Sequence, residues 1–246
     1  MNAGHPDAFP ATRHSVVRGI VNPDPEARRE SYGALVRSYW RPVYTYIRLR
    51  WHRAPADAQD LTQEFFARAF EKEYLARYDP ARARFRTFIR TCLDAFLANE
   101  QQSATRLKRG GGVVLESLDF AAIDGDLARH VPSSEPDPEA WFRREWIRSL
   151  FADAVQELRE RCDRSGRTNA FALFQKYDID GPDAGTRPTY ATLARELDLS
   201  VTDVTNQLAW ARRTFREIVL ESLRAFCATD TEFEAEARDV LGIQRP

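Results

Sequence analysis

Helix-start signals recur along this chain, and apolar residues follow them at intervals of three and four. Asp24-Pro25-Glu26 supplies an N-cap residue, a proline at the first helical position and an acid in the first turn. Asp137-Pro138-Glu139 repeats the signal. No segment shows the convincing apolar-polar alternation of a half-buried strand. These features predict an all-α fold.

The apolar spacing also predicts where the helices run. Three are expected in the first half, over about 24–50, 56–72 and 84–105, and together they form a compact bundle. A second helical domain is expected to begin at Asp137. It should continue through a short helix at about 170–177, a helical pair from Tyr190 to about Arg224, and an added helix after Thr229.

The character of the chain changes after Arg109. Gly110-Gly111-Gly112 and the acidic stretch that follows favour a flexible linker, although contact of the glycines with a DNA backbone is an equal alternative. The predicted organisation is two small helical domains joined by this linker. The segments are an N-terminal extension, a first domain, an acidic linker, a second domain and an extension helix, over 1–23, 24–109, 110–136, 137–228 and 229–246.

Composition narrows the class of protein. The 246 residues carry a formal net charge of -1, so attraction to nucleic acid must come from local basic patches. The three cysteines and four histidines are scattered without zinc-pair or disulfide spacing, so we expect no metal or cofactor and a reducing cytoplasm. No catalytic motif and no long apolar run occur, so neither an enzyme nor a membrane span is expected.

The segment from Tyr190 to about Arg224 predicts a helix-turn-helix. Leu193 and Leu197 give the first helix a buried face, and Asp198 tolerates the left-handed conformation that the turn needs. In such a motif the exposed start of the second helix lies in the major groove. The candidate DNA contacts there are Thr202, Thr205, Asn206 and Gln207, with Arg212 and Arg213 for phosphates. An inert helical hairpin is the alternative.

The first domain separates charges of opposite sign onto different helices. Asp57, Asp60 and Glu64 share one helix face, where like charges call for a basic partner or a solvated surface. Arg86 and Arg90 lie on the next helix. With neighbouring phenylalanines, they suit backbone phosphates and unstacked bases, although most of those rings should belong to the core.

Several segments together resemble bacterial sigma factors of the extracytoplasmic-function (ECF) type. The resemblance to sigma region two is carried by Tyr44–Arg48, Asp57–Phe66, Tyr78–Pro80 and Phe85–Arg90, in that order, and the helix-turn-helix is similar to sigma region four. The Lys-Arg-Gly-Gly-Gly run from Lys108 resembles the linker start of one subgroup. The resemblance covers about 16–223.

The resemblance implies roles for individual residues. Asp57, Asp60, Gln63 and Glu64 would contact the clamp of the largest subunit of core RNA polymerase. The residues placed near the double-stranded and melted minus-ten element are Arg86, Thr87, Phe88, Arg90, Asn99, Arg106, Lys108 and Arg109. The helix-turn-helix would read the minus-thirty-five element beside the flap of the second-largest subunit, and an anti-sigma factor is a further implied partner. The extension helix is expected to pack on the second domain and regulate access to DNA.

Some positions depart from the family pattern, and rival functions remain. Asp94, Ala95, Thr205 and Gln207 stand where bases or asparagine are frequent in the family. One rival is a polymerase-independent helix-turn-helix regulator, which has no use for the acidic face of the first domain. Another is a sigma-like regulator that lacks initiation activity.

Overall fold

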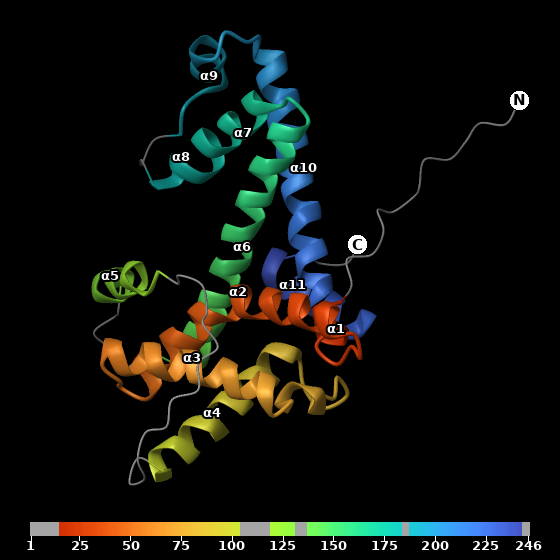
Figure 1. Ribbon diagram of the computed structural model, residues 1–246. Helices are drawn as coiled ribbons and strands as arrows, with labels where there is room; N and C mark the ends of the chain where they lie inside the picture. The colour runs from red at the N-terminus through yellow and green to blue at the C-terminus, as the bar shows by residue number, and fades with distance from the viewer. Residues whose placement is uncertain (1–14, 104–118, 131–136, 184–186, 243–246) are drawn as a thin grey trace, which may run out of the picture. The chain divides into compact units, whose positions relative to one another are not determined.

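The computed structural model describes residues 15–103, 119–130, 137–183 and 187–242. Every regular element in these ranges is helical, which confirms the predicted all-α fold. Figure 1 traces the elements from red at the N-terminus to blue at the C-terminus. They are α1 Val16–Gly19, α2 Pro25–Arg50, α3 Pro55–Glu71, η1 Tyr74–Arg77, α4 Phe85–Ser103, α5 Phe120–His130, α6 Pro138–Arg164, α7 Thr168–Phe174, the π-turn η2 Gln175–Ile179, α8 Asp180–Asp183, α9 Tyr190–Glu196, α10 Val201–Ala225 and α11 Asp230–Leu241.

The helix ends follow the capping signals in the sequence. The Asp24 carboxylate accepts hydrogen bonds from the backbone N–H groups of Glu26 and Ala27, which satisfies two of the free donors at the start of α2. The Thr229 hydroxyl accepts from the N–H of Glu232 in the same way at the start of α11. These local contacts explain why the main predicted helices appear within a few residues of their expected bounds.

The chain divides into two compact units, which confirms the two-domain layout. Unit 1 comprises 1–149 and 223–246, and unit 2 comprises 150–222. The division departs from the predicted second domain over 137–228. The reason is aromatic packing, because Phe142 and Trp146 of α6 lie against Tyr39 of α2 with ring centroids 6.4 Å apart in both cases. The first turns of α6 therefore belong to the core of unit 1.

Helix α2 is the centre of unit 1. Tyr39, Tyr44 and Ile47 are fully buried although they lie on different sides of the helix. A helix that is buried on several sides must be surrounded by other elements. Here α3 and α4 contribute Phe65, Phe85 and other rings that pack against α2 and against one another.

Part of the predicted flexible linker is helical. Phe120 of α5 packs against Trp40 and Tyr44, with ring centroids 5.2 and 4.9 Å away. Asp124 accepts hydrogen bonds from the Tyr44 hydroxyl at 2.7 Å and from Arg48 Nε at 2.9 Å. The expectation of a flexible linker is therefore wrong for 120–130, because an apolar ring and a paired carboxylate hold this segment on α2. Residues 104–118 and 131–136 lie outside the described residues.

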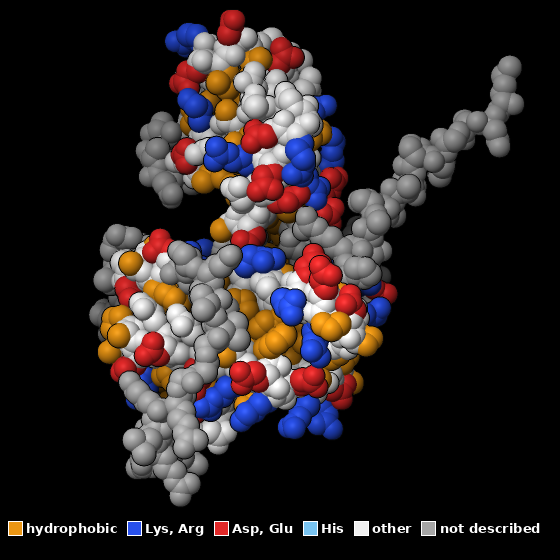
Figure 2. All heavy atoms as spheres, viewed as in Figure 1, with side chains coloured by type: hydrophobic (Ala, Val, Ile, Leu, Met, Phe, Trp, Pro, Cys, Tyr) orange, Lys and Arg blue, Asp and Glu red, His pale blue; other side chains and the backbone are white. Residues whose placement is uncertain are grey.

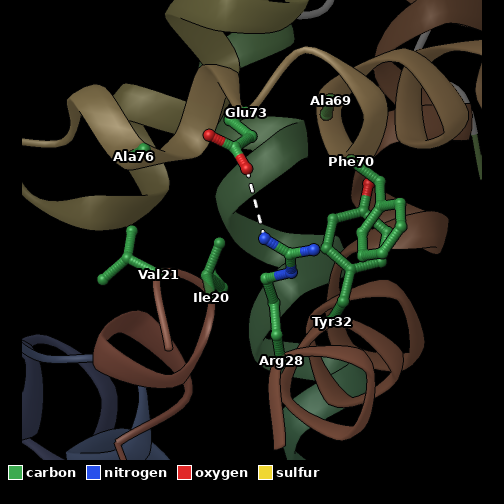
Figure 3. Close-up of a pocket in the computed structure, with 8 residues that line it drawn as sticks. All are labelled: Ile20, Val21, Arg28, Tyr32, Ala69, Phe70, Glu73 and Ala76. Atoms are coloured by element: carbon green, nitrogen blue, oxygen red, sulfur yellow. Dashed lines mark hydrogen bonds and ion pairs between the residues drawn. The ribbon is translucent and has the colours of Figure 1, made fainter. Parts of the chain in front are cut away.

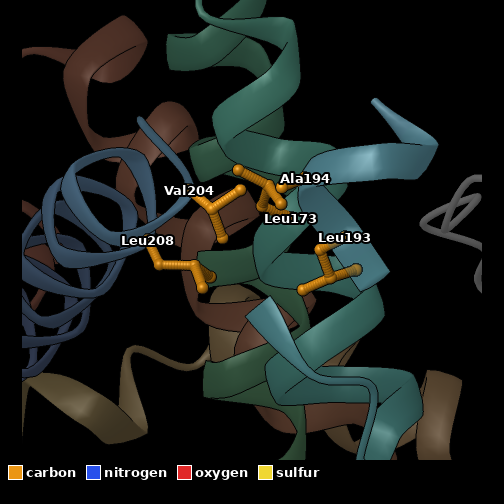
Figure 4. Packing of buried hydrophobic residues seen from close by; sticks show 5 residues of the cluster. All are labelled: Leu173, Leu193, Ala194, Val204 and Leu208. Carbon is orange, nitrogen blue, oxygen red and sulfur yellow. The ribbon is translucent and has the colours of Figure 1, made fainter. Parts of the chain in front are cut away.

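Unit 2 is built around a small apolar cluster shared by α7, α9 and α10. Figure 4 shows its side chains converging between the three helices, and its members are Leu173, Leu193, Ala194, Val204 and Leu208. Asp198 adopts the expected left-handed conformation with φ 53°. The N–H of Leu199 donates to the carbonyl of Ala194 at 2.9 Å, so the turn closes α9 with a Schellman-type bond.

The left-handed turn predicts a graded response to substitution at Asp198. Asp198→Val is expected to lower the free energy of unfolding by about 1–2 kcal/mol, because a β-branched residue pays the full steric cost of positive φ. Asp198→Gly should be close to neutral, since glycine adopts this conformation freely. Urea titration of both variants measures the difference, and equal stabilities would contradict the explanation.

A small pocket of about 90 Å³ lies between α2, α3 and η1 in unit 1 (Figure 3). The Arg28 guanidinium crosses it and pairs with Glu73 at 3.2 Å. Drug-sized ligands occupy about 300–1,000 Å³, so this volume suits at most a very small group.

The three cysteines are free thiols in environments that suppress reactivity. Burial raises the pKa of Cys92 to about 11 and that of Cys227 to about 12, and it also raises the pKa of Cys162. Because the thiolate is the reactive form, alkylation of Cys92 should be slow at pH 7 and should accelerate about tenfold per pH unit up to about pH 10. Iodoacetamide labelling with peptide mass mapping tests this. Rapid labelling of the folded chain at pH 7 would refute it.

Candidate polymerase- and DNA-binding surfaces

The acidic face of α3, which we define as Asp57, Asp60, Gln63 and Glu64, is present on one side of the helix. Asp57, Asp60 and Gln63 are exposed and Glu64 is half-buried, whereas Thr62 and Phe65 on the other side are buried. The structure therefore presents Asp57, Asp60 and Glu64 together, as the sequence spacing predicted, with Gln63 beside them.

The members of the acidic face differ in their surroundings. Glu64 pairs with Arg68, which also binds Glu100 at 2.5 Å. Burial opposes the charge of Arg68, but the two carboxylates outweigh it and raise its pKa. Glu64 is thus part of an internal ion-pair network, and Asp57 and Asp60 are the exposed carboxylates of this face.

The arginines at the start of α4 are occupied by carboxylates of α11. Arg86 is 12% exposed, and its guanidinium lies 3.0 Å from Glu236 and 3.2 Å from Asp239. Arg84 pairs with Asp239 and lies 3.7 Å from Glu236. The guanidinium of Arg86 also covers the ring of Trp146, 5.4 Å from its centroid. Acidic side chains therefore occupy Arg86, a candidate minus-ten contact, and the neighbouring Arg84.

Helix α11 packs on the first helical bundle, so the expectation that it packs on the second domain is wrong. Glu232 Oε1 accepts hydrogen bonds of 2.8 Å from the N–H of Phe85 and from the Tyr78 hydroxyl. Its other oxygen accepts from the N–H of Ala228, also at 2.8 Å. The carboxylate satisfies a free donor at the start of α4, which is why this end of the chain belongs to unit 1.

Burial and charge act in opposite directions on the α11 carboxylates. Burial raises the pKa of Glu236, and Arg86 and Arg84 only partly oppose the shift. Burial also raises the pKa of the more exposed Asp239, but hydrogen bonds and charge from the same two arginines outweigh it, so its pKa is lowered. The same two arginines therefore lower the pKa of Asp239 but leave the pKa of Glu236 raised.

The remaining candidate minus-ten residues have mixed environments. Arg90 lies 3.6 Å from Asp94 and 3.8 Å from Glu139. Phe88 is half-buried against Tyr78, with ring centroids 5.3 Å apart. Thr87 is half-buried, and Asn99 is exposed. Arg106, Lys108 and Arg109 lie outside the described residues.

The candidate recognition residues lie at the exposed start of α10. Thr202, Thr205 and Asn206 are exposed and Gln207 is half-buried. Ser200 and Asp203 form a reciprocal cap, since the N–H of Asp203 donates to the Ser200 hydroxyl at 3.0 Å and the N–H of Ser200 donates to the Asp203 carboxylate at 3.4 Å.

The two arginines further along α10 differ. Arg212 makes a bidentate pair with Asp178, at 2.8 and 2.9 Å, and the hydrogen bonds to this carboxylate raise its pKa. Arg213 is exposed. Of the two predicted phosphate contacts, Arg212 is already engaged by a carboxylate of unit 2.

Sequence reasoning missed the acidic side of α11. Glu232, Glu236 and Asp239 follow one another at four and three residues, which places them on one helix face. That spacing was available in the sequence, but its basic partner lies about 150 residues earlier in the chain.

Comparison with known proteins bears on the first unit alone. Residues 35–106 match the family model of sigma-70 region 2. The sigma-70 region 2 match spans most of α2 and all of α3, η1 and α4, and so includes the acidic face and the α4 arginines. Region 2 is a module that binds polymerase and DNA, and it is not an enzyme domain. Neither the curated proteins nor the solved structures include a match to this chain.

Two further features of the described residues bear on function. Lys and Arg side chains are interspersed with Asp and Glu on the face drawn in Figure 2, without one large patch of either sign. Within the described ranges, no cluster of three or more His, Cys, Asp or Glu has the arrangement of a metal site, and no helix is long and apolar enough to span a bilayer.

Proposed function

We propose that this chain is a sigma factor of the ECF type, which delivers core RNA polymerase to promoter DNA in the cytoplasm. The observation that carries the proposal is the sigma-70 region 2 match over 35–106, together with the exposed carboxylates Asp57 and Asp60 on the acidic face of α3. Its partners are core polymerase, promoter DNA and an anti-sigma factor.

Polymerase binding is assigned to the acidic face. Asp57 lies in the first turn of α3, where carboxylates are also favoured by the helix dipole. Asp60 follows three residues later, and both side chains are exposed. A basic surface, proposed to be the clamp of the largest subunit, would relieve the repulsion between them. Gln63 adds a neutral donor and acceptor to the same surface.

DNA binding is assigned to two places. The start of α4, with Arg86, Thr87, Phe88 and Arg90, would lie near the minus-ten element, helped by Asn99 and by Arg106, Lys108 and Arg109. The start of α10 would read the minus-thirty-five element through Thr202, Thr205, Asn206 and Gln207, with Arg212 and Arg213 on the backbone. The flap of the second-largest subunit would contact this domain.

A run-off transcription assay tests the proposal. Purified chain, core polymerase and a library of genomic promoter fragments should yield defined transcripts that core polymerase alone does not make. If the chain never associates with core polymerase, even at low salt, the proposal fails.

A second candidate is a sigma-like regulator without initiation activity. It is favoured by the start of α10, where Val201–Trp210 contains neither Lys nor Arg, and by the pairing of Arg84 and Arg86 with acidic residues. Binding to core polymerase without any transcript would select this candidate over the first.

A further inference from the structure

We propose that α11 is an intramolecular competitor of nucleic acid, because its carboxylates Glu236 and Asp239 occupy the guanidiniums of Arg84 and Arg86. DNA phosphates would bind these arginines only after the C-terminal half of α11 has left. The inference rests on the proposed function, in which the start of α4 meets the minus-ten DNA.

The contacts are those that a phosphate would make. Carboxylate and phosphate oxygens both form charge-assisted hydrogen bonds with arginine, often through two N–H groups at once. Arg86 lies in an ion pair with Glu236 at 3.0 Å that lacks hydrogen-bond geometry, and it donates a hydrogen bond to Asp239 at 3.2 Å. Arg84 pairs with the same two carboxylates. The carboxylates of Glu236 and Asp239 therefore occupy the positions where two backbone phosphates would bind.

The way in which α11 is docked suits a helix that can leave. Its fully buried residues are Glu232, Glu236 and Ala237, and its larger apolar residues Phe233, Val240 and Leu241 are only half-buried, so α11 buries no large apolar side chain completely. Most docked helices bury a stripe of large apolar side chains instead. An isolated helix of 12 residues is also marginal in water, so α11 depends on its polar contacts to stay folded.

The polar contacts divide α11 into an anchor and a releasable part. Glu232 bonds the N–H groups of Phe85 and Ala228 and forms the anchor near the start of the helix. The carboxylates of Glu236 and Asp239, further along, pair with Arg84 and Arg86, which DNA phosphates could also bind, and Arg143 adds a hydrogen bond of 3.0 Å to the Asp239 carbonyl. When DNA binds, its phosphates would replace the carboxylates of Glu236 and Asp239, so the positive charges of Arg84 and Arg86 would remain neutralised.

The experiment compares two pairs of substitutions that change the net charge equally. Glu236→Gln/Asp239→Asn removes the two carboxylates that face the arginines. Glu30→Gln/Glu234→Gln removes one exposed carboxylate from α2 and one from α11 and is the control. The probe is a fluorescein-labelled 20-nucleotide single strand of mixed sequence, and fluorescence anisotropy gives the affinity of the full-length chain over a range of salt concentrations.

The release variant should bind the strand about tenfold more tightly than the wild type, and the control should bind as the wild type does. For the release variant, the slope of log affinity against log salt concentration should become more negative by about 1.4, because two more phosphates are neutralised. Adding Arg84→Gln/Arg86→Gln to the release variant should abolish both gains. An unchanged affinity, or a gain that survives loss of the two arginines, would overturn the inference.

Hydrogen exchange of the wild-type chain gives a second test that needs no variant. Saturating DNA should speed exchange of the α11 amides while leaving the α2 amides protected. If α11 is equally protected with and without DNA, the inference is wrong even when the release variant does not fold. Failure of the proposed function has another signature, namely loss of core-polymerase binding, which this competition does not affect.

Discussion

Asp57→Lys/Asp60→Lys should weaken association with core RNA polymerase by about 100-fold or more while leaving the helical content intact. Both side chains are exposed, so reversal creates no buried charge in the free chain. In the complex, two lysines would face a basic surface, and like-charge contacts at an interface cost several kcal/mol. Biolayer interferometry with immobilised core polymerase measures the affinity, and far-UV circular dichroism measures the helix content.

The control and the choice of residues follow from the ion pairs. Glu64 is left unchanged because its reversal would place a lysine beside Arg68 and disturb the pair with Glu100. Glu30→Lys/Glu234→Lys makes the same change in net charge at exposed positions on other helices. If the control weakens binding as much as the test pair does, a general charge effect would replace the proposed docking face.

Leu208→Ala is expected to lower the free energy of unfolding of unit 2 by about 2–5 kcal/mol. Leu208 is fully buried in the cluster that joins α7, α9 and α10, and its truncation removes apolar contacts and leaves a cavity. In a domain of this size, such a loss lowers the melting temperature by roughly 8–40 °C. The duplex-DNA binding that we propose for unit 2 should be lost at temperatures where the unit unfolds.

Val201→Ala is the matched control for this substitution. Val201 is 50% exposed at the start of the same helix, so its truncation should change the stability by less than about 0.5 kcal/mol. Thermal melts followed by circular dichroism compare the two variants. Similar melting temperatures for Leu208→Ala and the wild type would show that α9 and α10 do not depend on this core.

The bounds of the long helices could be predicted because their signals are local. The side chain of Asp24 caps a helix that begins at the next residue, and Ser200 and Asp203 do the same for α10. Capping and spacing act within one or two turns, so the identity of nearby residues is sufficient. The acidic face of α3 was found for the same reason, since three and seven residues bring side chains to one side of a helix.

Helix α5 could not be predicted from local sequence signals. Glycines and acidic residues before it favour a linker, yet Phe120 and Asp124 hold α5 on α2. The ring and the carboxylate find their partners about 76–80 residues earlier in the chain. The residues of the segment itself do not predict such contacts, because tertiary packing overrides weak intrinsic helix propensity.

The sequence by itself determined the all-α class, the positions of the main helices and the carboxylates that share a face on α3. Only the tertiary structure decided that α11 joins the first unit and that Arg84 and Arg86 meet Glu236 and Asp239. The physical reason is that a helix face is set by bonds within a few residues, whereas the partner of a charge is set by how distant helices pack. The sequence around Arg84 and Arg86 therefore does not reveal that both are paired with carboxylates in the folded protein.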